Sequence, residues 1–160
     1  MKIRYAVWVE VPQKIGLISK VKTPHLSILW PFFLNTGVTE KNILEKVRNI
    51  LFESFEARLS KLSVWEQKDK KILVVEVEPK EKFQKIFGEV LLALRSDIVF
   101  DKSVFSEGLL PNFLPHITID YDFNGDVSKL DKQELIKCFF AVDKMGLYRE
   151  EERGRWIKCE

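Results

Sequence analysis

The sequence predicts an α+β fold in which most strands are antiparallel. Segments that alternate like strands are interspersed with segments whose apolar residues recur at helical spacing. Polar stretches between neighbouring strand-like segments predict at least two hairpins, and hairpins join antiparallel strands. Each half of the chain also carries one helical segment of about four turns and one copy of a short motif. We therefore expect one domain over residues 1–160, made of two similar, intertwined lobes.

The first elements are two strands and a helix. Residues 4–11 alternate in the manner of a strand, which Pro12 ends. A basic loop or short helix leads to a second strand, which begins near residue 24 and which residues 30–32 (WPF) are expected to close. Thr39 is a suitable N-cap for an amphipathic helix that runs to about residue 56.

The middle of the chain predicts a hairpin followed by a second helix. Residues 57–65 and 71–77 are extended segments, and the polar residues 66–70 form the turn between them. Pro79 is placed to open the helix. The apolar stripe of this helix consists of Phe83, Ile86, Phe87, Val90, Leu91 and Leu94.

The last third predicts a loop, a strand, a short helix and two further strands. The loop contains residues 108–112 and leads to the strand that carries the second histidine. A short helix is expected at 129–137. One strand at 139–148 and another at 155–159 follow, joined by a charged, glycine-containing turn.

Composition limits the class of protein. The 160 residues are 46% apolar and 31% charged with a net charge of +2, which suits a sizeable core and not the coating of long nucleic acid by charge alone. A short or single-ended anionic ligand needs only a few local basic residues. Cys138 and Cys159 have no metal-ligand spacing, and reduced thiols are the simpler expectation, although a disulfide stays open. With no secretory signal or membrane-length apolar run in view, we expect a cytoplasmic monomer with no obligate protein partner.

Both histidines of the chain lie in one repeated pattern, Pro-His-apolar-hydroxyl-apolar. The copies are PHLSI at residues 24–28 and PHITI at residues 115–119. Side chains alternate between the two faces of a strand, so each histidine shares a face with the hydroxyl two residues later. The four side chains that this pattern singles out are His25, Ser27, His116 and Thr118.

Two imidazoles that face one cavity can divide acid and base work at neutral pH. An ordinary histidine pKa near 6.5 allows one ring to be neutral while the other is protonated. The Ser27 and Thr118 hydroxyls can donate to the nonbridging oxygens of a phosphoryl group as charge develops there. In-line displacement at the phosphorus of a nucleotide ester is the reaction class that uses all four groups, and it needs no metal or cofactor.

Other interpretations are weaker. His116, Asp120 and Asp122 could supply metal ligands, but they are spread over ~20 Å of extended chain. Acyl transfer by a Ser-His-Asp triad lacks a GxSxG nucleophile elbow. Both histidines could also be structural.

The motifs resemble those of the two-histidine (2H) phosphoesterase superfamily, in particular the LigT-like branch of 2′-5′ RNA ligases and cyclic phosphodiesterases. The stretch PHLSILWPF at 24–32 is similar to the first motif of that branch, and PHITI to the second. The resemblance implies a bilobal, pseudo-twofold fold with two largely antiparallel sheets, flanking helices and an active site in the central cleft. It also implies a hydrolase with metal-independent chemistry on 2′,3′-cyclic phosphates or 2′-5′-linked nucleotide and RNA ends, as in RNA processing.

The same resemblance implies roles for single residues. His116 would be the base that activates water and His25 the acid that protonates the ribose oxygen, with the roles exchanged in the ligase direction. Ser27 and Thr118 would hold the phosphate. An aromatic residue follows each histidine by five positions, and these two, Trp30 and Tyr121, could stack on a nucleobase.

The chain departs from the family pattern at two places. Ser27 stands where threonine is commoner, and Asp120 to Asp122 occupy a stretch where many members have a basic residue that can bind phosphate. Two carboxylates there would repel a polyanion, which disfavours long RNA and ligase activity and leaves a non-catalytic nucleotide- or RNA-end-binding module as the alternative. Replacement cations, which could equally be ordinary surface charges, are Arg4, Lys20, Lys22 and Arg149.

Overall fold

The computed structural model describes residues 2–16, 19–67, 69–103, 113–130 and 137–160. Within these ranges, nine strands form one sheet. The strands are β1 (Tyr5–Glu10), β2 (His25–Leu34), β3 (Phe55–Gln67), β4 (Lys70–Glu78), β5 (Ile98–Phe100), β6 (His116–Asp120), β7 (Phe139–Val142), β8 (Gly146–Glu152) and β9 (Arg155–Lys158). The helices are α1 (Gln13–Gly16), α2 (Glu40–Arg48), α3 (Lys80–Leu94) and a 3-10 turn, η2 (Val127–Lys129).

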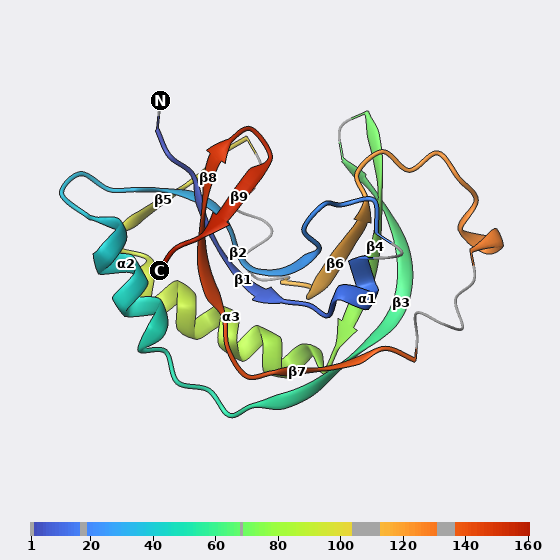
Figure 1. Ribbon diagram of the computed structural model, residues 1–160, viewed down its shortest axis with the longest axis horizontal. Coiled ribbons are helices and arrows are strands. Elements are labelled where there is room, and N and C mark those ends of the chain that lie inside the picture. The colour runs from blue at the N-terminus through green and yellow to red at the C-terminus, as the bar shows by residue number, and fades with distance from the viewer. Residues whose placement is uncertain (1, 17–18, 68, 104–112, 131–136) are drawn as a thin grey trace.

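The sheet is antiparallel and strongly curled, and the two histidine strands lie at its middle (Figure 1). Its strand order is β7-β3-β4-β6-β2-β1-β8-β9, with β5 paired to the far part of β2. The two halves of the sheet are joined where β2 pairs with β6, with Leu26 opposite Ile117. The predicted α+β fold with largely antiparallel strands is confirmed, and the two expected sheets meet through this pair in one continuous sheet.

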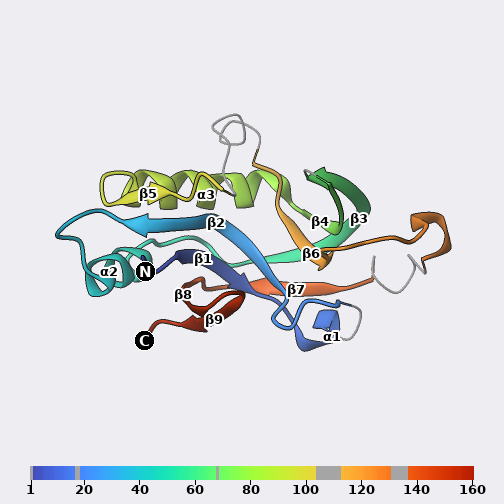
Figure 2. The same cartoon turned by 90° about the horizontal axis from the view of Figure 1, so that it is seen from above.

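The two longer helices supply much of the core. Helix α3 runs along one side of the sheet (Figure 2) and follows Pro79, as the sequence predicts. Thr39 and Asn42 form a reciprocal capping box at the start of α2. The buried faces of α2 and α3 consist of Ile43, Leu44, Val47, Phe83, Ile86, Phe87, Val90 and Leu94.

Two predicted boundaries in the first half are wrong. Helix α2 ends at Arg48 instead of near residue 56, because Asn49 caps it and the chain then turns outward, leaving Leu51 90% exposed. Strand β2 continues through Pro31 to Leu34 instead of closing there. The register of β1 and β2 shifts between the Tyr5–Phe32 and Val7–Leu29 pairs. Pro31 lies within this irregularity, where the regular pattern of backbone hydrogen bonds is interrupted, so its missing N–H is tolerated.

The single strand predicted at 139–148 is two strands in different halves of the sheet. β7 pairs with β3, whereas β8 pairs with β1, so the chain crosses between the halves at residues 143–145. Val142 and Leu147 are both fully buried, and the exposed, charged residues between them mark the break. The short strand β5, which follows α3, was likewise not predicted.

Some expectations fall outside the described residues. The loop at 108–112 and most of the helix expected at 129–137 lie there, and η2 covers only the start of the latter. No disulfide joins Cys138 and Cys159. Among the residues that the structure describes, no helix is long and apolar enough to cross a membrane.

Candidate active site

The pairing of β2 with β6 brings the two histidine motifs together on one face of the sheet. Stepping one residue along each strand from the Leu26–Ile117 pair places His25 opposite Thr118; the opposite step places Ser27 opposite His116. Directly opposite residues have Cα atoms about 4.5–5.5 Å apart. The two histidines are diagonal neighbours, about 7–8 Å apart at Cα, so both rings can reach a group that lies over the centre.

Apolar residues that alternate with the four polar ones hold the two strands in place from the opposite face of the sheet. Leu26, Ile28 and Ile117 are fully buried on the opposite face, as the two-residue alternation predicts. His25, Ser27, His116 and Thr118 are all partly buried. A one-residue slip of either strand would bury the polar set and expose the apolar one, so the core holds the register.

Each imidazole is held through the same nitrogen. Nδ1 of His25 lies 2.8 Å from the Thr23 carbonyl oxygen, and Nδ1 of His116 lies 2.8 Å from the Leu114 carbonyl oxygen. A carbonyl can only accept, so Nδ1 carries a proton in both rings. Nε2 is therefore the nitrogen that exchanges a proton with a bound group in each ring.

Each ring also has a tryptophan neighbour that the motif analysis did not identify. The ring of Trp8 on β1 stacks on His25, with centroids 3.5 Å apart and planes 12° apart. Trp65 on β3 lies 4.3 Å from His116 at 57°. Trp8 in turn stacks on Tyr148 of β8 at 4.5 Å. The alternation of β1 could have identified Trp8. The main core contains Tyr5, Val7 and Val9, whereas Trp8 projects from the other face of the strand.

Burial lowers the pKa of both histidines. For His25 the pKa falls to about 4: desolvation is the largest cause, the Thr23 carbonyl opposes it, and the charge of His116 lowers it further. Desolvation also lowers the pKa of His116, against the Leu114 carbonyl and the negative charge of Glu76. The free site therefore holds mainly neutral rings near pH 7, and an anion bound between them would raise both pKa values.

The two predicted stacking residues lie in different places. The Tyr121 side chain is 51% exposed; desolvation raises its pKa, and a smaller interaction with the Thr118 side chain lowers it. Trp30 packs edge-on against Phe87 of α3 and against Phe113, with centroids 5.6 and 5.9 Å away. The structure thus brings Tyr121 to the histidine cluster and places Trp30 against the apolar side of α3.

The carboxylates after the second motif are partly neutralised. Lys20 Nζ lies 2.6 Å from Asp120 Oδ2, and the Asp122 backbone N–H donates to Asp120 Oδ1 at 3.0 Å. Lys20 chiefly holds the pKa of the buried Asp120 carboxyl below its usual value, against desolvation. The Lys20 backbone N–H also donates to the Ile119 carbonyl, so the segment before His25 is fastened to β6.

Two of the other candidate cations form structural ion pairs. Arg4 pairs with Glu150 and Asp101, and Arg149 pairs with Glu40. Lys22 lies near the histidines, on the wall of a cavity of ≈ 510 Å³ beside His25. The cavity is lined by Trp8, Glu10, Val11, Lys22, Thr23, Pro24, His25, Tyr148 and Lys158.

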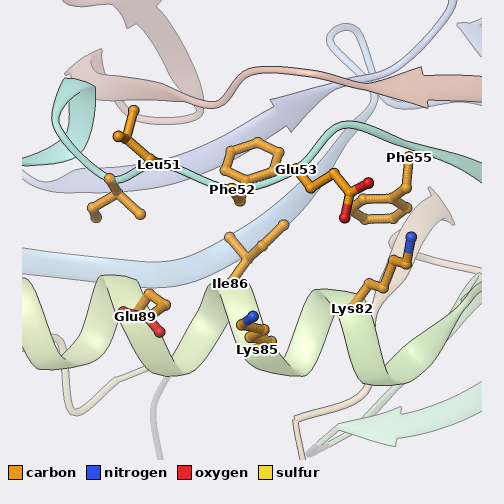
Figure 3. A pocket seen from close by; sticks show the side chains of 9 residues that line it. Leu51, Phe52, Glu53, Phe55, Lys82, Lys85, Ile86 and Glu89 are labelled. Atoms are coloured by element: carbon orange, nitrogen blue, oxygen red, sulfur yellow. The ribbon is translucent and has the colours of Figure 1, made fainter.

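A second cavity, of ≈ 370 Å³, lies between α3 and the segment that joins α2 to β3 (Figure 3). The lining from that segment includes Leu51, Phe52 and Glu53, and the lining from α3 includes Lys82 and Ile86. It contains none of the four motif side chains, and we assign it no role. Across the described part of the chain, no group of three or more His, Cys, Asp or Glu side chains could hold a metal ion.

The fold and the paired motifs define a class of protein. The family profile of the 2′-5′ RNA ligase superfamily matches residues 14–154. The chain belongs to this superfamily, which confirms the resemblance to two-histidine phosphoesterases and supports a function of the phosphoesterase or ligase type.

Solved structures, including those of LigT, share the fold of this chain. E. coli LigT complexed with phosphate superposes with a TM-score of 0.69 at 15% identity, covering 100% of this chain and 96% of that one. LigT complexed with 3′-AMP gives 0.66 at 16% identity, with 100% and 97% covered. The protein TT0787 of Thermus thermophilus gives 0.68 at 16% identity, with 98% and 95% covered. No curated protein matches this chain in sequence.

Proposed function

We propose that this protein is a metal-independent phosphodiesterase that opens 2′,3′-cyclic phosphates or hydrolyses related phosphodiesters at nucleotide and RNA ends. The observation that carries the proposal is the arrangement of two imidazoles and two hydroxyls across β2 and β6. His25 faces Thr118 and Ser27 faces His116, so a phosphoryl group over the centre meets a ring and a hydroxyl on each side. LigT, which shares the fold, has been crystallised with phosphate and with 3′-AMP.

The four groups are sufficient for hydrolysis. One neutral ring takes a proton from water through Nε2 as the water oxygen bonds to phosphorus. The bond from phosphorus to one ribose oxygen breaks, and the other ring, protonated, gives its Nε2 proton to that oxygen. Ser27 and Thr118 donate hydrogen bonds to the nonbridging oxygens, where negative charge grows. The product is a phosphomonoester with one free ribose hydroxyl.

The surroundings of the site supply room and charge. We assign the cavity beside His25 to the group on that side of the phosphorus, either water or a nucleoside that presents a hydroxyl. Trp8 and Tyr148 give this cavity aromatic walls, and Lys22 gives it positive charge, while Lys158 is paired with Glu10 on the same wall. Because Lys20 pairs with Asp120, one of the two carboxylates repels an anionic substrate less than the sequence alone implies. Tyr121, beside Thr118, is the sequence-predicted aromatic that we retain for substrate contact.

The test is turnover of a panel of nucleoside 2′,3′-cyclic phosphates in the presence of a chelator. His25→Ala and His116→Ala should each lower kcat/KM by about 10²- to 10⁴-fold, the usual worth of a general acid or base. Circular dichroism and thermal melts confirm that each variant is folded. Full activity of either folded variant would end the two-imidazole mechanism. Saturable binding of the cyclic nucleotides by the parent protein, without product, would favour the alternative of a binding module.

A further inference from the structure

Each histidine has a glutamate as its outer neighbour in the sheet. On β1, Glu10 lies opposite His25; on β4, Glu76 lies opposite His116. Cross-strand neighbours project from the same face, so each imidazole lies between a hydroxyl on one side and a glutamate on the other. The sequence does not relate these two glutamates, because neither belongs to the repeated motif.

The two glutamates differ in burial and in partners. Glu76 is 9% exposed; its carboxylate accepts a hydrogen bond from Ser63 Oγ at 2.9 Å and from Lys80 Nζ at 3.0 Å. These donors keep the pKa of Glu76 below its usual value although burial opposes them. Glu10 has a side chain that is 53% exposed and is bound by Lys158 and by the Tyr148 hydroxyl. Each carboxylate thus has two donors, one of them a lysine, and the difference lies in solvent: water screens the exposed Glu10, whereas Glu76 is a buried charge held in one place.

The other surroundings of the two rings are alike. Both rings donate from Nδ1 to a carbonyl at 2.8 Å, both contact a tryptophan, and both have a hydroxyl across the β2–β6 pair. Desolvation acts on both in the same direction. The negative charge of Glu76 raises the pKa of His116, and among the residues that the structure describes no carboxylate acts comparably on His25. This glutamate is thus the charge that distinguishes the two imidazoles, beside the cavity that adjoins His25.

We propose that Glu76 is a positioning residue that favours a proton on His116 over one on His25, so that the proton which accompanies a bound phosphodiester lies on His116 and His25 is left as the neutral base. The inference rests on the proposed function. In hydrolysis, His25 then takes the proton of the water that enters from the adjoining cavity. His116 gives its proton to the leaving ribose oxygen. This allocation is the reverse of the one that the family resemblance implies.

Charged and polar groups from every neighbouring element bear on this effect. A proton on His25 of β2 would compete with one on His116, and Lys80 at the start of α3 offsets part of the Glu76 charge. Lys80 is the weaker influence on His116 because its side chain is 41% exposed, so that solvent screens its charge more than that of Glu76. The groups that face His116 or Glu76 are His25 and Ser27 from β2, Thr118 from β6, Lys61, Ser63 and Trp65 from β3, and Lys80 from α3.

The experiment is a titration of the imidazole Cε1–H signals by NMR, which needs no turnover. The chain has two histidines, so the spectrum holds two titrating signals, assigned by His25→Ala and His116→Ala. In Glu76→Gln we expect the midpoint of His116 to fall by about one pH unit, as for loss of a nearby opposite charge, while that of His25 does not fall. The limb of the kcat/KM–pH profile that belongs to His116 should move by the same amount.

Two further variants make the result decisive. Glu78→Gln makes the same change two residues along β4, at a side chain that pairs with Arg58 away from the rings, and should leave both midpoints unchanged. Lys80→Met keeps the carboxylate, removes its exposed cation and should raise the midpoint of His116, which tests the sign even where Glu76→Gln folds poorly. A merely structural role for Glu76 would lower stability without moving either midpoint, and that outcome overturns the proposal. If His25→Ala and His116→Ala both lose turnover while Glu76→Gln leaves the two midpoints unchanged, the proposed phosphodiesterase activity is supported and only the role of Glu76 is refuted.

Discussion

Replacing Thr118 with valine isolates the contribution of one hydroxyl at the centre of the site. Valine keeps the branched shape and strand preference of threonine, and Thr118 is partly buried between His25 on β2 and Val74 on β4. The fold loses at most the interaction of the Thr118 hydroxyl with the Tyr121 side chain, so the free energy of unfolding should fall by no more than ~1 kcal/mol. The catalytic cost should be larger than this.

The catalytic cost follows from the charge of the acceptor. A hydrogen bond from a hydroxyl to a charged phosphoryl oxygen contributes about 1.5–3 kcal/mol. At about 1.4 kcal/mol per factor of ten, Thr118→Val should lower kcat/KM on a 2′,3′-cyclic nucleotide by about 10- to 150-fold. Because the charge on those oxygens grows in the transition state, most of the loss should appear in kcat.

The assay is steady-state hydrolysis by the parent and by two threonine variants. Thr36→Val makes the same chemical change at an exposed turn between β2 and α2 and should leave kcat/KM unchanged. A folded Thr118→Val enzyme that keeps kcat/KM within about twofold of the parent would refute the placement of the phosphoryl group over this hydroxyl.

Two other predictions concern pH and stability. If His25 is the base, log kcat/KM should rise as the pH passes through about 4, the pKa of that ring, and a fall there in stopped assays would contradict the role. Lys20→Met should lower the free energy of unfolding by ~1 kcal/mol at pH 7, a modest value because the Lys20 side chain is 76% exposed. Since the pKa of Asp120 is lowered in the folded protein, this deficit in urea melts should shrink as the pH falls below about 4, and a deficit that is independent of pH would exclude the ion pair as its cause.

Local alternation was enough to predict the polar face of each motif but not the way the two motifs meet. The His-x-hydroxyl spacing places His25 with Ser27 and His116 with Thr118, and the structure retains both pairs. The register that sets His25 opposite Thr118 depends on pairing between strands 91 positions apart, which no local pattern encodes. For the same reason, the sequence could not show that β7 and β8, adjacent in the chain, belong to opposite halves of the sheet.

Irregularities in the strands explain where alternation fails. Trp30 follows His25 by five residues, but the β1–β2 register shifts between the Trp8–Ser27 and Val7–Leu29 pairs, so the face cannot be counted through to Trp30. Glu76 could have been noticed, since it is one charge within an otherwise apolar run of β4 whose neighbours Val75 and Val77 are buried in the core. A charged residue at such a position indicates a polar partner on the other face of the sheet.

The site has an approximate twofold relation, and its departures from symmetry carry chemical meaning. Exchanging the two halves about the β2–β6 pair exchanges His25 with His116, Ser27 with Thr118 and Glu10 with Glu76. In a fully symmetric site the two imidazoles would have the same pKa. In-line displacement, however, needs a base on one side of the phosphorus and an acid on the other. The buried charge of Glu76 on one side and the open cavity beside His25 on the other provide that distinction. The direction of attack would then be set by residues outside the repeated motifs, which can vary without loss of the two histidines.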